Sequence, residues 1–257
     1  LAPPAPQTYI QAFQELPPLA AQLLYNRGIR SPAQADAFLA TDEALMGDPF
    51  ALPDMDRAVS RLYRALLSGE TIAVYGDFDA DGVTATALLV QALEELGGRV
   101  APYIPHRVDE GHGLNGRALQ NLAEQGCSLL ISADCGITGV HGGAVPQGMD
   151  LIVTDHHLPP AQQPAYFAAI NPHLSSSQYP YPDLTGVGMA FKLVQALYSS
   201  LGRSSSESLL ELVAIGTIAD LGPLVGENRY LVRRGLEAMA RAHRPGLLAL
   251  AQVAHVS

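Results

Sequence analysis

The stretch AVYGDFDAD at residues 73–81 decides the fold, because a short apolar run leads directly into closely spaced aspartates. Two later stretches repeat this pattern, namely LLISAD at residues 129–134 and LIVTDHH at residues 151–157. Each apolar run is too short for a helix and ends at turn-forming residues. Each run therefore predicts a buried strand with polar side chains at its carboxyl end.

The elements around these stretches predict an α/β fold with a doubly wound, mostly parallel sheet. Strands are expected at residues 71–75, 99–104, 128–133, 150–154 and 166–170. Helices are expected at residues 54–68, 83–96, 115–125, 139–149, 188–200, 206–217 and 229–242. Strands that alternate with helices of about 10–15 residues are typical of βαβ units. The helix at 139–149 is the least regular of these, since the segment is rich in glycine and contains Pro146.

Composition excludes several classes of protein. Hydrophobic residues make up 48% of the 257 residues and charged residues 16%, which is ordinary for a globular enzyme and not for a disordered chain. No apolar run approaches the ~20 residues of a membrane span, so no membrane association is expected. The formal charge of −10 disfavours a protein that binds nucleic acid over its whole surface. Two cysteines and the lack of a signal-like leader predict a cytoplasmic location.

The three stretches predict a metal site with two ions. Neighbouring parallel strands end at one edge of a sheet, where ligands bind. Carboxylates gathered there would repel one another unless cations neutralised them. The residues that this arrangement would deliver to the edge are Asp77, Asp79, Asp81, Asp134, Asp155, His156 and His157.

The segment DFDADG at residues 77–82 has a second interpretation, because it matches the start of an EF-hand calcium loop. No glutamate falls at the twelfth position, and a strand rather than a helix precedes the segment, so the calcium loop is disfavoured. Alternate residues of an extended segment point the same way, so Asp77, Asp79 and Asp81 are expected on one side. Gly82 then leads the chain into a helix.

The remaining polar motifs differ in how specific they are. Asp155-His156-His157 is the most specific, since it offers imidazole ligands, a carboxylate to orient one of them and a proton donor. Asp134 and Asp220, each taken alone, fit ordinary turn or helix-end residues. Cys135 is expected to be a free core cysteine rather than a ligand.

Two sets of basic residues lie outside these motifs. Arg107 follows a predicted strand within IPHR and is well placed to bind a phosphate oxygen. Four histidines lack a comparable context and are expected to be surface or loop residues, namely His141, His173, His243 and His255.

The motifs occur in an order that closely resembles the RecJ-type single-strand-specific exonucleases of the DHH phosphoesterase superfamily. They are DFDADG, IPHR followed by EGHGLN, SADCGIT, VTDHH, NPH, GVGMAFKL, GTIAD and ENRYLVRRGL. The resemblance covers roughly residues 50–240. It is far more specific than the DHH triplet alone, because all of these motifs appear in the family's order.

The resemblance implies two divalent cations, Mn²⁺ by preference or Mg²⁺, and a role for each site residue. Asp77 and Asp79 would hold one ion, and Asp134 would bridge both. The other ion would be held by Asp81, His156 and Asp220. His157 would face the scissile phosphate as proton donor or electrophile, with Asp155 behind it. Arg107 and His106 would contact the substrate phosphate.

The resemblance also implies metal-assisted phosphodiester hydrolysis, acting 5′→3′ on single-stranded DNA in recombination and repair. Single-stranded DNA is the expected partner, together with a single-strand-binding protein and a helicase. Residues 1–50 would form a helical or irregular lead-in, 51–225 the DHH domain, and 226–257 a helical segment leading toward an absent second domain.

Two departures from the family are visible. Family members are longer, and their further domains supply much of the single-strand selectivity, so selectivity and polarity are open for this chain. His112 stands where many relatives carry tyrosine, which would alter a stacking or positioning contact.

Two alternative functions remain open. A DHH phosphoesterase of small substrates would act on oligonucleotides, cyclic dinucleotides or pyrophosphate, but IPHR and ENRYLVRRGL favour the exonuclease branch. A non-catalytic DHH scaffold could lose its metal ligands without penalty, whereas every ligand position is filled in this sequence.

Overall fold

The computed structural model describes residues 3–13, 15–39, 45–241 and 244–255. The chain divides into two compact units, Leu1–Leu45 and Met46–Ser257. The first unit contains short helices around a small apolar core, with Tyr9 donating a hydrogen bond to the carbonyl of Ile29 (2.9 Å). Its helices are α1 (Gln7–Gln11), α2 (Pro18–Asn26) and α3 (Pro32–Leu39).

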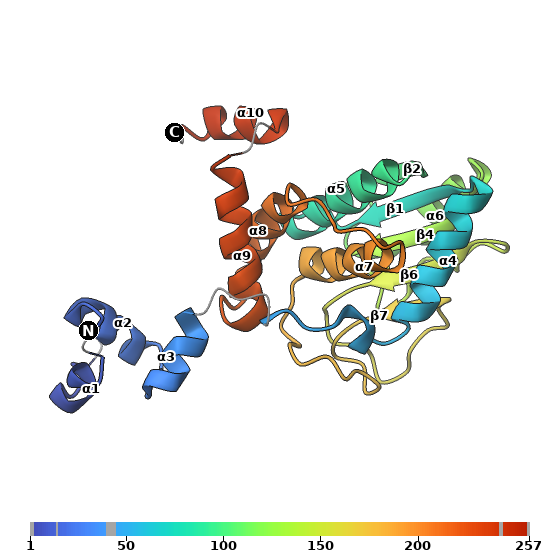
Figure 1. The fold of residues 1–257 in the computed structure, drawn as a ribbon. Helices are drawn as coiled ribbons and strands as arrows, with labels where there is room; N and C mark the ends of the chain where they lie inside the picture. Colours follow the sequence, from blue (N-terminus) through green and yellow to red (C-terminus); the bar gives the residue numbers. More distant parts are fainter. Residues whose placement is uncertain (1–2, 14, 40–44, 242–243, 256–257) are drawn as a thin grey trace. The chain divides into compact units, whose positions relative to one another are not determined.

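The second unit is built on a parallel sheet of five strands in the order β2-β1-β4-β6-β7. The strands are β1 (Thr71–Gly76), β2 (Arg99–Tyr103), β4 (Cys127–Ala133), β6 (Asp150–Thr154) and β7 (Ala168–Ile170). The chain leaves β1 for β2 on one side and then crosses to β4 on the other, so the topological switch point lies between β1 and β4. The predicted doubly wound α/β fold is confirmed (Figure 1).

Helices follow and separate these strands (Figure 1). They are α4 (Met55–Ser68), α5 (Ala80–Glu95), α6 (Gly116–Glu124), α7 (Gly186–Ser200), α8 (Leu209–Ala219), α9 (Gly226–Met239) and α10 (Pro245–Val253), with a 3₁₀ turn, η2, at Pro49–Ala51. Among the described residues, no helix is both long enough and apolar enough to cross a membrane.

The two faces of the sheet bury different helices. Leu119 of α6 joins Tyr75 and Val153 in one apolar cluster on one face. Val74 and Ile152 alternate with these strand residues, so they point to the opposite face and are fully buried there. Helices α5 and α7 contact the same strands and cover this second face. The sheet is therefore buried on both sides, as its continuous apolar strands require.

A buried ion pair links α7 to α9. Lys192 and Glu227 are both fully buried and pair with each other. Tyr179 donates to Glu227 Oε2 (2.5 Å), and Lys192 Nζ donates to the carbonyl of Gly47 (2.9 Å). Because α9 begins just after the segment that contains Asp220, this cluster fixes the chain where it leaves the site.

The expected helix at residues 139–149 is wrong. Val140–His141 forms a short strand, β5, which pairs in parallel with β3 (Leu114–Asn115) in a separate two-stranded sheet. Gly139, Gly142 and Gly148 all have positive φ angles, which a right-handed helix does not contain. The glycines therefore make turns here, and the connection between β4 and β6 is mostly loop.

Candidate metal centre

Three aspartates stand at the same level, directly beyond three neighbouring strands. The amide of Asp77 donates to the carbonyl of Ala133 (3.2 Å), and the amide of Asp134 donates to that of Thr154 (3.0 Å). The amide of Asp155 likewise bonds to the carbonyl at the end of β7 (3.2 Å). The backbone ladder of the sheet therefore continues through each aspartate and fixes its position at the carboxyl edge. All three residues are at least 95% buried.

Asp79 and Asp81 do not continue this extended segment, so the expectation that Asp77, Asp79 and Asp81 lie on one side of a strand is wrong. Helix α5 begins at Ala80, and Asp79 is its N-cap, accepting from the amide of Gly82 (2.9 Å). Side-chain capping by aspartate stabilises a helix start, which explains why the helix begins before Gly82. Asp81 therefore lies in the first helical turn.

Asp81 turns toward the start of α7. Its carboxylate accepts from the amides of Gly186 (2.6 Å) and Val187 (2.8 Å), and the residue is 1% exposed. These amides carry the positive end of the α7 dipole, which favours a negative charge. Asp81 thus joins two helices at the metal-binding edge.

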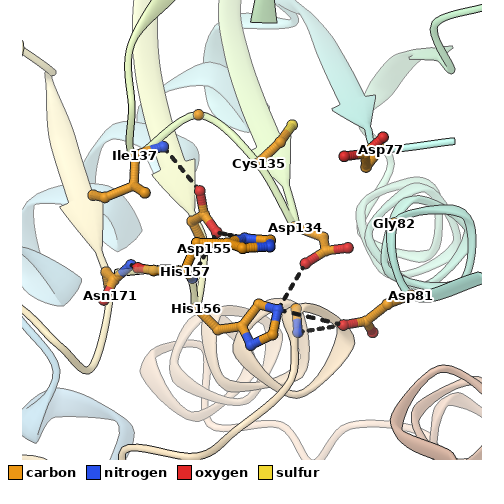
Figure 2. A network of polar contacts seen from close by, with 12 residues as sticks. Asp77, Asp81, Gly82, Asp134, Cys135, Ile137, Asp155, His156, His157 and Asn171 are labelled. Atoms are coloured by element: carbon orange, nitrogen blue, oxygen red, sulfur yellow. Dashed lines mark hydrogen bonds and ion pairs between the residues drawn. The ribbon is translucent and has the colours of Figure 1, made fainter. Parts of the chain in front are cut away.

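His156 lies between two carboxylates, as Figure 2 shows. Its Nε2 atom is 3.1 Å from Asp134 Oδ1 and 4.0 Å from Asp81 Oδ2. Two groups of ligand atoms each lie within 4.8 Å of one another, and they share His156. One group is Asp81, His156 and Asp220, and the other is Asp134, His156 and His157.

The first of these groups contains the three residues that the sequence assigned together to one ion. Asp220 enters it from the C-cap of α8. Asp134 stands next to the group through its contact with His156. Asp77 and Asp79 belong to neither group of described residues. Their assignment to the other ion stays a prediction.

The buried carboxylates fit a bound cation. Asp134 Oδ1 is buried and accepts no hydrogen bond from the described residues. Burial, together with the charge of Asp79, raises the pKa of Asp134 to about 9. Burial and the charge of Asp134 raise the pKa of Asp81 to about 7. Cations prefer such carboxylate and imidazole donors, and they would relieve the unfavourable concentration of negative charge.

Glycine at two positions leaves room for these carboxylates. A Cβ atom on Gly186 would lie 2.3 Å from Asp134 Oδ1. A Cβ atom on Gly216 would lie 2.3 Å from Thr84 Oγ1 and 2.8 Å from Asp81 Oδ1. Helices α7 and α8 therefore approach the site more closely than alanine would permit.

Asp155 orients His157 through two bonds. Asp155 Oδ1 lies 2.8 Å from His157 Nδ1 and accepts from the His157 amide (3.0 Å), while Oδ2 accepts from the amide of Ile137 (2.8 Å). Its bond to Asp155 raises the pKa of His157 to about 9. Burial raises the pKa of Asp155, but the bonds from His157 and Ile137 outweigh it and hold that pKa below its ordinary value. The pair is a fixed imidazolium and carboxylate at neutral pH.

A cavity of about 210 Å³ opens beside this pair, and two histidines that were not assigned to the site line it. His112 Nδ1 lies 3.0 Å from Asp77 Oδ2, and the His112 ring packs against Phe78 (centroids 4.2 Å apart). His141 was expected to be an ordinary surface residue, yet β5 brings it to the same cavity. A sequence signal existed for His112, which follows β2 at the same sheet edge, but not for His141.

The remaining candidates lie at the rim or away from it. Arg107 is exposed, with its guanidinium 5.1 Å from the centre of the Phe78 ring. His106 is exposed and pairs with Asp109 (2.8 Å). Cys135 is buried in the core, as expected. His173 and His255 lie outside both ligand groups, and His243 falls outside the described residues.

A doubly wound sheet with an Asp-His-His triplet and further aspartates at its switch edge defines a class of α/β domain with a candidate metal site. Comparison with known proteins identifies the family within that class. Residues 71–217 match the "DHH family, N-terminal domain". The chain belongs to the DHH family.

The chain is also similar to proteins named "Single-stranded-DNA-specific exonuclease RecJ". It is 44% identical over 232 residues to the one from Bacillus subtilis (strain 168), covering 90% of this chain and 29% of that protein. It is 38% identical over 257 residues to the one from Escherichia coli (strain K12), covering 94% and 44%. The chain thus spans less than half the length of these relatives.

Solved structures give the same result. "Crystal structure of exonuclease RecJ bound to manganese" aligns with a TM-score of 0.69 and 39% identity, covering 79% of this chain and 52% of that one. The structure of RecJ from Thermus thermophilus in complex with Mn²⁺ aligns with a TM-score of 0.75 and 32% identity, covering 99% and 37%. The resemblance inferred from the motifs is confirmed.

Proposed function

We propose that this chain carries the catalytic domain of a metal-dependent nuclease that hydrolyses phosphodiester bonds in single-stranded DNA. The observation that carries the proposal is the pair of ligand groups sharing His156, beside the unpaired and buried Asp134 Oδ1. The similarity to RecJ proteins, whose names and structures include single-stranded DNA and manganese, supports the substrate and the metal. The cofactors are two divalent cations, Mn²⁺ by preference or Mg²⁺.

The metal ligands follow from the positions of the side chains. Asp81, His156 and Asp220 hold one ion, and their mutual proximity supports this set. Asp77 and Asp79 hold the second ion, and Asp134 serves both. When bound, the ions would activate a water molecule and stabilise the charge that develops on the phosphate.

The other side chains bind and orient the substrate. Asp155 holds His157 in one tautomer, so His157 presents its Nε2 proton toward the phosphate or the leaving oxygen. Its raised pKa keeps that proton in place at neutral pH. Arg107, with His106 next to it, takes a non-bridging phosphate oxygen at the rim.

The biological setting is proposed from the same similarity. The enzyme degrades single strands 5′→3′ in the cytoplasm during recombination and repair, working beside a single-strand-binding protein and a helicase. Residues 51–225 form the catalytic domain, with 1–50 and 226–257 as flanking helical segments.

Parallel hydrolysis assays with Mn²⁺ test the proposal. The substrates are 5′-labelled single-stranded DNA, duplex DNA, a dinucleotide and pyrophosphate. Release of mononucleotides from the single strand alone is the expected result. Activity confined to the two small substrates would replace the proposal with a small-substrate phosphoesterase, and two bound ions without any hydrolysis would indicate a binding module.

A further inference from the structure

The loop at residues 104–113 joins β2 to β3 and carries both Arg107 and His112. A single carboxylate closes it. Glu110 Oε1 accepts from the hydroxyl of Tyr103 (2.6 Å), and Glu110 Oε2 accepts from the amide of His106 (2.8 Å). One oxygen of Glu110 thus reaches the end of β2, and the other reaches the loop's own backbone, so the loop is tied to the sheet across its base.

The sheet side of this connection is rigid. Tyr103 is the last residue of β2, and its ring stacks on that of Tyr75 (centroids 5.1 Å apart, planes at 27°). Tyr75 is fully buried, and its hydroxyl donates to the carbonyl of Gly113 at the far end of the loop (3.1 Å). Burial and the neighbouring Glu110 raise the pKa of Tyr103 to about 12, so its hydroxyl remains a donor. Two stacked tyrosines therefore hold both ends of the loop.

The loop positions its cationic and aromatic side chains against the metal-binding segment. The His112 ring packs on Phe78, and the Arg107 guanidinium lies over the same ring. His112 also contacts Asp77. Arg107 is exposed and reaches the rim from the loop, so its place relative to the phosphate depends on the backbone that carries it.

We propose that Tyr103 and Glu110 form a latch that positions the 104–113 loop for substrate phosphate binding. The two residues act through Arg107 and His112 and do not touch the substrate. This inference rests on the proposed phosphodiesterase function for its kinetic consequence, but the latch itself is a property of the folded loop. Breaking the latch lets the loop sample other positions, so part of the substrate-binding free energy is lost in reordering it.

Kinetics with single-stranded DNA and Mn²⁺ provide the first test. Tyr103→Phe removes one hydrogen bond to a carboxylate, and Glu110→Ala removes both bonds. The expected result is a KM about tenfold higher for Tyr103→Phe and higher still for Glu110→Ala, with kcat within about twofold and Mn²⁺ stoichiometry unchanged. Glu110→Gln should restore a near-normal KM, because its amide oxygen can accept from His106 while its amide nitrogen donates to the Tyr103 hydroxyl.

The chain offers a matched control. Tyr198 also donates to a glutamate, Glu95 Oε2 (3.0 Å), but this pair joins α7 to the end of α5 rather than the loop. Tyr198→Phe should leave KM unchanged. Equal KM values for Tyr103→Phe, Tyr198→Phe and the unaltered protein would overturn the proposal.

Tryptic cleavage after Arg107 provides a second test that does not depend on activity. Cleavage should be about tenfold faster in Tyr103→Phe and Glu110→Ala than in the unaltered protein, Glu110→Gln or Tyr198→Phe. If the unaltered protein hydrolysed none of the substrates, the proposed function would fail, while faster cleavage would still support the latch. Unchanged cleavage in both latch variants would refute the latch whatever the activity.

Discussion

Replacing Gly186 with alanine should disable the metal centre without removing a ligand or a charge. The added Cβ would lie 2.3 Å from Asp134 Oδ1 and 2.5 Å from its Cγ, whereas ordinary contact begins at 3.4 Å. Either the carboxylate or the start of α7 must therefore move by about 1 Å. The same start of α7 supplies the amides that bind Asp81, so movement of the helix would disturb that ligand as well.

The magnitude follows from this displacement. Overpacking of a buried site costs about 1–3 kcal/mol of stability. Misplacing a group at an active site by about 1 Å reduces the rate on the order of 100-fold. We therefore expect Gly186→Ala to fold, to bind Mn²⁺ more weakly and to hydrolyse single-stranded DNA about 100-fold more slowly.

Gly188→Ala is the matched control, since it lies in the same helical turn. Its Cβ would meet no atom closer than 3.4 Å, so it should retain metal binding and activity. Calorimetric titration with Mn²⁺ and initial hydrolysis rates measure both variants, and urea unfolding checks their stability. Wild-type affinity and rate in Gly186→Ala would refute the geometry of the centre described above.

Three further predictions concern single side chains. Lys192→Met should lower the free energy of unfolding by about 3–5 kcal/mol in urea titration, because it leaves the Glu227 carboxylate buried without its cation, whereas the double variant Lys192→Met/Glu227→Leu should lose less; a single variant within about 1 kcal/mol of wild type would contradict this. The bond to Arg61 is the largest of the effects that lower the pKa of Glu70, so the stability that Glu70 contributes should be complete above pH 4.5 and decline as pH falls through its folded pKa; the unfolding curves of wild type and Glu70→Gln should converge in acid, and a difference that grows in acid would reverse the sign. Arg107→Ala should raise KM for single-stranded DNA with an unchanged Mn²⁺ stoichiometry, and an unchanged KM would reject its phosphate role.

Much of the fold was predictable, because the strands that matter are buried on both faces. Runs such as LLIS before Asp134 leave few alternatives to a central parallel strand, and the order of the runs implies the crossovers. The start of α5 was predicted too late, since Asp79 was interpreted as a metal ligand and not as the N-cap that it forms in the structure. The segment 139–149 was predicted from its place in the alternation, but its glycines occupy positive φ angles.

The candidate site was predictable to the level of the sheet edge and no further. The rule that parallel strands end together placed Asp77, Asp134 and Asp155 side by side, as the structure has them. The sharing of His156 between two groups depends on how α5 and α8 pack, which no local pattern specifies. His141 reaches the cavity only through the pairing of β5 with β3, a long-range register that leaves no signal in the sequence.

The most direct test of the central claim is the number of Mn²⁺ ions bound per chain, measured by metal titration of the wild-type protein and of Asp134→Ala. The account predicts two ions in the wild type and the loss of both in Asp134→Ala, because this carboxylate serves both positions. A wild-type chain that binds no ion, or an Asp134→Ala variant that retains two, would contradict it.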